Sequence, residues 1–234
     1  EHHSIGAFRM IDRSAIFWIP TLTLLLGCET PPPPGPPMPT LPTGNFTAPA
    51  HSSLGEIERL DSALDQLIAR GAVIEQLADG FDWAEGPVWV QAAQGEGFVL
   101  FSDIPPNKIY KWSEADGLED FLQPSGYTGT TLRAGQPGSN GLLLDAQGRL
   151  VLCQHGDRRI ARLASSLNAP QPTYQTVIGT YQGKRFNSPN DGCFDRHGNL
   201  YFTDPPYGLE KRMSDPAKEL SFQGVYLFTQ GGEL

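Results

Sequence analysis

The sequence predicts an all-β fold in which small sheets repeat about every 50 residues, as they do in the blades of a β-propeller. Each repeat has a short strand that starts with an acidic or amide side chain, a turn containing Gly, and a second strand. The repeats start at Glu85, Asn140 and Asn190, so they begin 55 and then 50 residues apart. Residues 72–234 have room for about three such sheets, whereas propellers typically contain four to eight. We therefore expect this region to be a partial propeller that lacks its C-terminal sheets.

Composition is consistent with a folded, turn-rich chain. Hydrophobic residues make up 39% of the sequence, which is enough for a packed core, and 26 Gly and 21 Pro favour many turns. The formal net charge of −9 argues against the basic surface that a phosphate backbone requires. We therefore expect no nucleic-acid partner.

Residues 1–28 are predicted to be upstream residues followed by a lipoprotein signal peptide. Arg13 precedes a mostly apolar run of 13 residues, 15–27, which is too short to cross a bilayer but has the length of a signal-peptide core. The run ends in L-L-G-C at Cys28, which resembles a bacterial lipobox. We expect Cys28 to be lipidated and the exported protein to face the periplasm or the cell surface. The alternative is a chance apolar run before a buried Cys.

Two segments follow before the repeats begin. Residues 29–52 contain nine Pro, which predicts a semi-extended linker without a core. Residues 53–71 are predicted to be a helix, because Ser53 and Glu56 form a capping box and Gly71 is a suitable C-cap. The apolar residues expected on one face of this helix are Ile57, Leu60, Leu64, Leu67 and Ile68.

The remaining two cysteines, Cys153 and Cys193, occupy non-equivalent positions in the repeats. We expect them to be small, unpaired side chains in strands. The alternative is a disulfide, which an oxidising compartment would permit.

The strand starts carry the side chains that point to a metal. The innermost strands of a propeller run along its central channel, so Glu85, Asn140 and Asn190 are expected to form a ring around it. A carboxylate with amide oxygens is a ligand set suited to Ca²⁺ or Mg²⁺. The alternative is that these residues only satisfy the backbone where each strand begins.

Other polar residues allow more than one role. His155 lies in a polar turn, where it is either a proton carrier or a turn residue. Tyr207 either stacks on a sugar-like ring or closes a hydrophobic edge. The sequence has no G-x-S-x-G elbow, which leaves Ser-His-Asp hydrolysis unsupported. Hydrogen bonds between sheets are expected at the ends of the second strands, from Asp103, Gln154 and Asp204.

Seven motifs in order resemble the SMP-30/gluconolactonase/LRE-like family, in its bacterial gluconolactonase branch, over roughly residues 72–234. They are E-G-P-V-W from Glu85, S-D-I-P from Ser102, S-N-G-L from Ser139, G-R-L…H-G-D-R-R from Gly148, G-K-R-F-N-S-P-N-D from Gly183, Y-F-T-D-P-P-Y-G from Tyr201 and G-V-Y from Gly224.

The resemblance implies a six-bladed propeller with one divalent metal in its channel, most often Ca²⁺, with Mg²⁺ or Zn²⁺ as alternatives. Glu85 and Asn190 match metal-binding positions of the family. Ser188 stands where some relatives have Arg, so substrate contacts are expected to differ there. The residues expected to contact substrate are Asn140, Asp191, His155 and Tyr207.

The implied activity is metal-assisted hydrolysis of a sugar lactone to an aldonic acid. The family's proposed general base is an Asp in a later P-D-G motif, which this sequence lacks, so the catalytic residue is unknown and we expect this chain alone to be inactive. The alternatives are a ligand-binding or scaffold propeller on a lipid tether, and a hydrolase of other lactones or esters. The expected membrane contact is limited to the lipid on Cys28.

Overall fold

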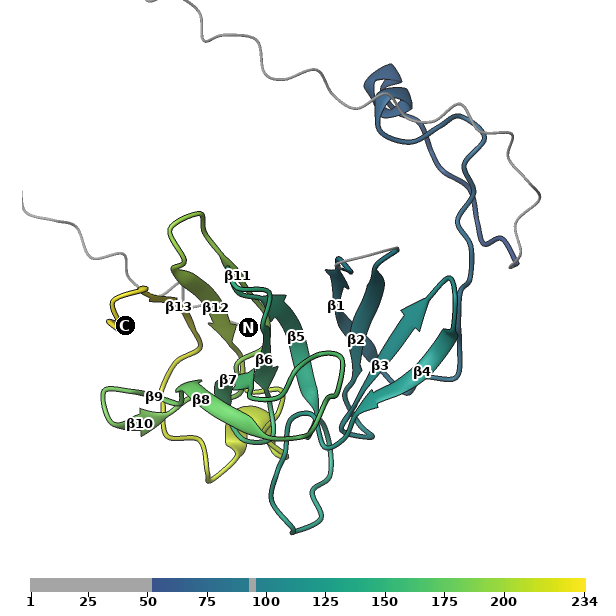
Figure 1. Cartoon of the computed structure of the whole chain (residues 1–234). Coiled ribbons are helices and arrows are strands. Elements are labelled where there is room, and N and C mark those ends of the chain that lie inside the picture. The colour runs from purple at the N-terminus through teal and green to yellow at the C-terminus, as the bar shows by residue number, and fades with distance from the viewer. Residues whose placement is uncertain (1–51, 93–95) are drawn as a thin grey trace, which may run out of the picture. The chain divides into compact units, whose positions relative to one another are not determined.

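The computed structural model of the chain describes residues 52–92 and 96–234 (Figure 1). The predicted signal peptide, the lipidation site at Cys28 and nearly all of the Pro-rich linker lie outside these residues. Within the described part of the chain, no helix combines the length and the apolar character needed to cross a membrane.

Three antiparallel sheets, each made of consecutive strands, dominate the described residues (Figure 1). The first sheet contains β1 (Ala84–Val90), β2 (Phe98–Asp103), β3 (Lys108–Ser113) and β4 (Gly117–Leu122). The middle sheet contains β5 (Ser139–Leu144), β6 (Leu150–Gln154), β7 (Arg159–Leu163) and β8 (Tyr174–Ile178). The third contains β11 (Gly192–Phe194), β12 (Leu200–Asp204) and β13 (Gly224–Phe228). The smaller elements are the hairpin β9 (Thr180–Tyr181) and β10 (Lys184–Arg185), and the 3₁₀ turns η1 (Ser62–Gln66) and η2 (Arg212–Ser214).

The predicted repeat is confirmed down to its turns. In the middle sheet, the Gly148 amide donates to the Asp145 carbonyl at 2.8 Å, and in the third sheet Gly198 does the same to Asp195 at 3.1 Å. Both glycines have positive φ, 72° and 81°, a conformation that side chains with Cβ rarely adopt. The same Asp-x-x-Gly turn therefore joins the first and second strands of both sheets.

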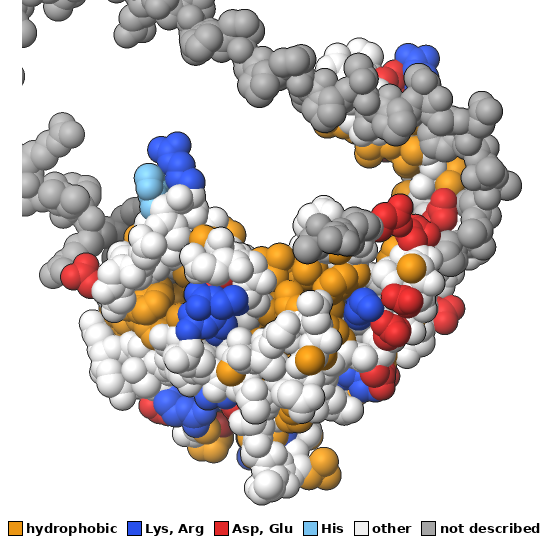
Figure 2. Space-filling view, in the orientation of Figure 1, with side chains coloured by type: hydrophobic (Ala, Val, Ile, Leu, Met, Phe, Trp, Pro, Cys, Tyr) orange, Lys and Arg blue, Asp and Glu red, His pale blue; other side chains and the backbone are white. Residues whose placement is uncertain are grey.

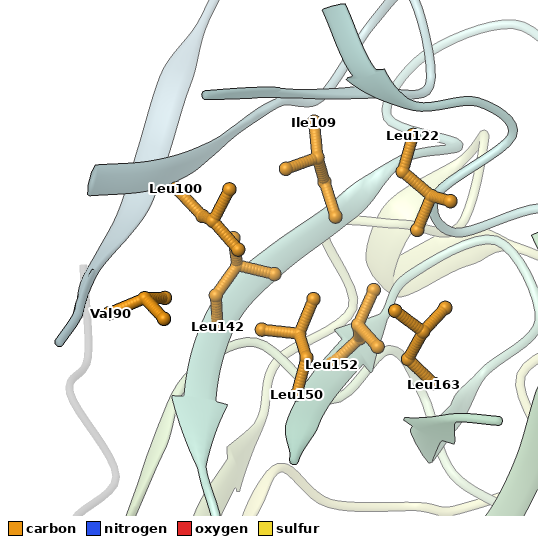
Figure 3. Close-up of a cluster of buried hydrophobic side chains, with 8 residues drawn as sticks. All are labelled: Val90, Leu100, Ile109, Leu122, Leu142, Leu150, Leu152 and Leu163. Carbon is orange, nitrogen blue, oxygen red and sulfur yellow. The ribbon is translucent and has the colours of Figure 1, made fainter. Parts of the chain in front are cut away.

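Strand β6 supplies side chains to two hydrophobic cores. Leu150 and Leu152 pack in the cluster shared with the first sheet (Figure 3), whereas Val151 and Cys153 pack in the cluster shared with the third sheet. Successive side chains of a strand point to opposite faces, so a strand between two sheets is apolar at every position. The unbroken run L-V-L-C in β6 is the sequence counterpart of that burial.

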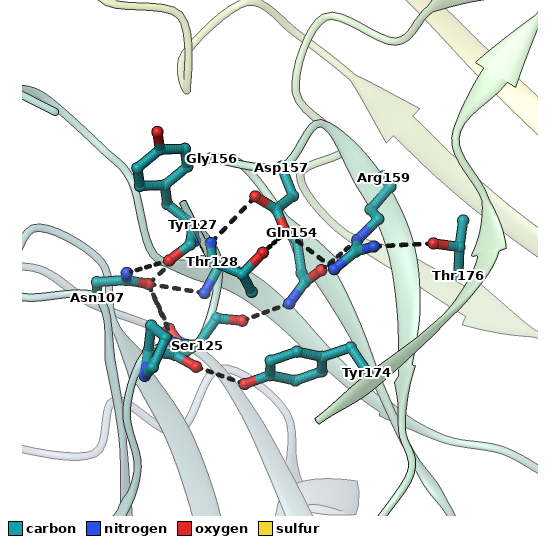
Figure 4. A network of polar contacts seen from close by, with 12 residues as sticks. Asn107, Ser125, Tyr127, Thr128, Gln154, Gly156, Asp157, Arg159, Tyr174 and Thr176 are labelled. Carbon is teal, nitrogen blue, oxygen red and sulfur yellow. Dashed lines mark hydrogen bonds and ion pairs between the residues drawn. The ribbon is translucent and has the colours of Figure 1, made fainter. Parts of the chain in front are cut away.

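A polar network holds the connection between the first and middle sheets (Figure 4). The Asn107 Oδ1 accepts hydrogen bonds from the backbone amides of Ser125, Gly126 and Tyr127 at 2.7–3.2 Å. Gln154 donates from Nε2 to the Ser125 carbonyl at 2.8 Å. The connection is thereby fixed from both sheets.

The residues that end the second strands act differently from the prediction. Asp103 accepts hydrogen bonds from the backbone amides of Asp82 and Trp83, which lead into β1. Asp204 accepts from the amides of Asn187 and Ser188, at 2.8 Å each, on the way to β11. These carboxylates fasten the chain that enters their own sheet. Gln154 alone fits the prediction of a bond between sheets, because the connection that it holds comes from the first sheet.

The predicted helix over residues 53–71 is wrong apart from the short 3₁₀ turn at Ser62–Gln66. Ser53 does not cap a helix but forms an isolated β-bridge with Glu75. The turn begins instead at Asp61, whose side chain accepts from the Ala63 amide at 2.7 Å. Leu60 is 85% exposed and Leu67 68% exposed, so the other described residues leave much of the apolar stripe uncovered. Short helices are marginal without such packing.

Candidate functional site

The first strands of the three sheets meet closely at the positions that the repeat predicts. Strand β5 contacts both β1 and β11. A Cβ on Gly86 would overlap the carbonyl of Asn140, and one on Gly141 would overlap Asp191. The Gly141 amide donates to the Asn190 carbonyl at 2.8 Å. The structure therefore brings together the strand starts that carry Glu85, Asn140 and Asn190, and glycines permit the approach.

Irregular pairing accompanies this approach. The register of β1 with β2 shifts between Glu85 and Val88, and that of β5 with β6 shifts between Ser139 and Leu142. Bulges of this kind redirect side chains and are frequent beside active sites. They stand at equivalent points of the two sheets, at the E-G-P and S-N-G motifs.

Glu85 is an exposed residue near the start of β1. Its Oε1 accepts a hydrogen bond from Trp83 Nε1 at 2.9 Å. This hydrogen bond places Trp83, which directly precedes β1, to orient the Glu85 carboxylate. The two residues are near neighbours in W-A-E, so the contact has a local signal in the sequence.

Asn190 is half-buried, and its backbone is held on two sides. Its amide donates to the Thr203 carbonyl at 2.9 Å, and its carbonyl accepts from Gly141. Its side-chain Nδ2 lies 3.1 Å from Nε2 of His155. His155 is fully buried, and burial lowers the pKa of its imidazole to about 4, so the ring is neutral near pH 7. His155 therefore lies behind Asn190 and has no solvent-accessible surface.

Asn140 and Asp191 flank this pair. Asn140 is 7% exposed, and its carbonyl accepts from Ser102 Oγ at 2.8 Å. Asp191 is exposed, and its Oδ1 accepts from the Gly192 amide at 2.8 Å. The side chain of Asp191 also borders Gly141, so the acidic group stands at the junction of β5 and β11.

Tyr207 lies in a loop that is fixed from beneath, and its own side chain is 49% exposed. Ser188 Oγ donates to the Pro205 carbonyl at 2.5 Å and accepts from the Gly208 amide at 2.9 Å. Arg133 donates from Nη2 to the Gly208 carbonyl at 2.9 Å. Ser188, where the sequence suggested altered substrate contacts, is thus buried and holds the Tyr207 loop. Nothing local in the sequence reveals this role.

The sequence profile of the SMP-30/Gluconolactonase/LRE-like region matches residues 83–234 of this chain. The chain belongs to that family. The resemblance seen in the seven motifs is therefore confirmed.

Two relatives place the chain within the SMP-30/gluconolactonase family. It is 38% identical over 186 residues to a protein named gluconolactonase from Zymomonas mobilis, and the match covers 78% of this chain and 50% of the relative. The structure of a gluconolactonase from Xanthomonas campestris superimposes with a TM-score of 0.62 and 29% identity, over 81% of this chain and 58% of that one. The chain spans about half the length of the curated relative that it matches.

The strand starts carry oxygen donors, which are the ligand type that hard divalent cations take. The described residues contain no group of three or more His, Cys, Asp or Glu side chains that could hold a metal. The glycine contacts instead bring together the strand starts that carry the Glu85 carboxylate and the side-chain amides of Asn140 and Asn190. Oxygen ligands of this kind suit Ca²⁺ or Mg²⁺ better than Zn²⁺, which prefers Cys and His. Ca²⁺ takes six to eight oxygens, so this set would be completed by others.

Cys153 and Cys193, the cysteines of the described residues, are both free thiols. Cys153 is buried in the core between the middle and third sheets, and Cys193 is exposed on β11. The expectation that they are unpaired is confirmed in this structure, although only Cys153 is buried.

Proposed function

We propose that these sheets are part of a metal-dependent lactonase that opens a sugar lactone to an aldonic acid. The observation that carries the proposal is the meeting of three strand starts at Gly86 and Gly141, which gathers Glu85, Asn140 and Asn190. Relatives named gluconolactonase support the same reaction class. Because the curated relative is about twice as long as the matched region, we propose that activity needs further sheets of a six-bladed propeller.

The proposed roles follow from where each residue lies. Glu85 and Asn190 would hold Ca²⁺, with Glu85 oriented by Trp83. When bound, such a cation polarises a carbonyl and lowers the pKa of water. Asn140 and Asp191 stand beside these ligands and would contact the hydroxyls of the lactone. Tyr207 is exposed on a braced loop and would stack on the sugar ring.

The described residues also permit a binding function without chemistry, because oxygen donors of this kind can hold a ligand without cleaving it. Asp191 is the acidic side chain at the junction of β5 and β11, and it accepts a hydrogen bond from its own neighbour Gly192. A ligand-binding propeller, tethered at the membrane by a lipid on Cys28, is therefore the second candidate. Turnover of gluconolactone, and of a panel of other lactones and esters, separates the candidates.

A chimera tests the first proposal. Residues 83–234 replace the matching half of the Zymomonas mobilis relative, and acid release from gluconolactone is followed with Ca²⁺ and with EDTA. We expect activity that EDTA abolishes, and a loss of at least about 100-fold in Glu85→Gln, because metal ligands contribute several kcal/mol to the transition state. Glu119→Gln, an exposed carboxylate paired with Lys111 on the first sheet, is the matched control and should be unaffected.

Two results would contradict the proposal in different ways. Full activity in Glu85→Gln would contradict the role of Glu85 as a metal ligand. If the 234-residue chain alone were as active as the chimera, the proposal that activity needs additional sheets would be contradicted.

A further inference from the structure

We propose that His155 is a positioning residue that fixes the side-chain amide of Asn190, with the amide oxygen turned away from the imidazole and toward the metal site. The inference rests on the proposed function for the identity of that site. It gives His155 a role through Asn190 rather than through contact with substrate.

The contact between the two side chains selects one orientation of the amide. Asn190 Nδ2 lies 3.1 Å from His155 Nε2. An amide nitrogen only donates hydrogen bonds, so the ring nitrogen that faces it must accept. The flipped amide would turn its NH₂ group toward the cation, and donors repel a cation. The pairing with His155 therefore presents an oxygen where a ligand is needed.

The backbone of Asn190 is held in place, so the orientation of its side-chain amide is what remains to be fixed. The Asn190 amide donates to the Thr203 carbonyl at 2.9 Å, and its carbonyl accepts from Gly141 at 2.8 Å. These bonds tie the residue to β12 on one side and to β5 on the other. These backbone bonds do not determine which way Oδ1 and Nδ2 of the side chain point. The contact with His155 does.

The surroundings of His155 keep the ring able to accept. The residue is fully buried, and Gly208 packs so closely that an added Cβ would lie 2.6 Å from the His155 Cβ. The neutral ring has one proton, and acceptance at Nε2 places it on Nδ1. Nδ1 has no hydrogen-bond partner among the described residues. A buried N–H group without a partner destabilises the fold. This cost accompanies the tautomer that leaves Nε2 free to accept from Asn190.

The tautomer is measurable in the wild-type 234-residue chain, before any substitution. Nitrogen-15 spectra of labelled histidine should show Nδ1 of His155 protonated and Nε2 unprotonated at pH 7. A protonated Nε2 would overturn the proposal, because the ring would then donate to the amide oxygen and turn it away from the metal site. This measurement needs neither metal nor activity.

Calorimetric titration of the chimera described above with Ca²⁺ tests the consequence. His155→Phe keeps a ring but removes the acceptor, and we expect Ca²⁺ affinity to fall by about 10- to 100-fold, as it does when residues behind metal ligands are changed. His155→Gln restores an acceptor and should recover most of the affinity. His197→Phe, which changes an exposed turn histidine of the third sheet, is the matched control.

A double substitution separates positioning from packing. In Asn190→Asp both side-chain atoms are oxygens, so no orientation has to be selected, and adding His155→Phe should change Ca²⁺ affinity little. An equal loss in both backgrounds, or unchanged affinity in His155→Phe alone, would overturn the proposal. Thermal unfolding in EDTA reports whether each variant folds. A chimera that binds no Ca²⁺ contradicts the metal site, whereas the tautomer still decides the role of His155.

Discussion

The middle and third sheets share a repeat and a turn but differ in how many of their faces are buried. Every residue of β6 in the middle sheet is buried, with alternate side chains in two cores. In β12 of the third sheet, Leu200 and Phe202 are buried whereas Tyr201 between them is 40% exposed. The strand pairing puts Tyr201 beside Cys193 and Leu227 across the sheet. One face of the third sheet is thus a row of exposed side chains, most of them apolar.

This difference indicates what kind of surface the third sheet presents. Val225 on β13 is 76% exposed and Leu227 is 40% exposed, and hydrophobic side chains reach the surface of the molecule in Figure 2. The equivalent face of the middle sheet is covered by the third sheet itself. We therefore propose that the open face packs against a further sheet of the proposed propeller.

Truncating one leucine in each sheet should separate them most clearly. Leu152→Ala removes a fully buried side chain from the core between the first and middle sheets, and should lower the free energy of unfolding by about 2–5 kcal/mol. Leu227→Ala changes the open face of the third sheet and should cost no more than about 0.5 kcal/mol. Urea denaturation of the 234-residue chain measures both. Equal losses would contradict the contrast, and in the chimera described above the loss from Leu227→Ala should increase.

The sequence predicted the sheets well because their signals are local. Strands at Phe98–Asp103, Leu150–Gln154 and Leu200–Asp204 agree with the structure, since period-two patterns and Gly turns are read within a few residues. The helix predicted over residues 53–71 did not form, because its apolar stripe is an equally local signal, whereas the packing of that stripe against other described residues depends on the fold. Periodicity therefore predicted what a segment prefers, not whether its preference is met.

The candidate site shows the same division. The repeat predicted that Glu85, Asn140 and Asn190 lie together, because equivalent positions of successive sheets are neighbours. It did not predict that His155 is sealed behind Asn190, or that Ser188 faces inward. Both depend on the loop at Gly208, which lies far along the chain from His155 and is brought in only by the fold.

The buried carboxylate of the third sheet should give stability a measurable pH dependence. Burial raises the pKa of Asp204 from 3.8 to about 6, although hydrogen bonds from the amides of Asn187 and Ser188 oppose the rise. The folded protein therefore holds this proton more tightly than the unfolded chain does. The stabilisation from Asp204 is complete below about pH 4 and is lost as the pH rises through 6.

Comparison with Asp204→Asn isolates that contribution. The stability of the wild type relative to the variant should fall by about 3 kcal/mol between pH 3.5 and 7.5, since each unit of pKa is worth about 1.4 kcal/mol. His155 titrates in the same range with the opposite sign, but both proteins contain it, so its effect cancels. Asp120→Asn on β4, an exposed carboxylate paired with Lys108, should show no such trend. A difference independent of pH would exclude a raised pKa at Asp204.

Thiol labelling of Cys153 and Cys193 compares the burial of the middle sheet with that of the third sheet, without a substitution that changes stability. Cys153 is fully buried in the middle sheet, and burial raises the pKa of its thiol, so both access and thiolate formation are suppressed. Cys193 is exposed on the open face, so a maleimide should label it in the native chain, and label Cys153 only after unfolding. Peptide mass spectrometry locates each label. In the chimera, a further sheet packed on that face should slow labelling of Cys193, while persistent rapid labelling there would show that the face stays open.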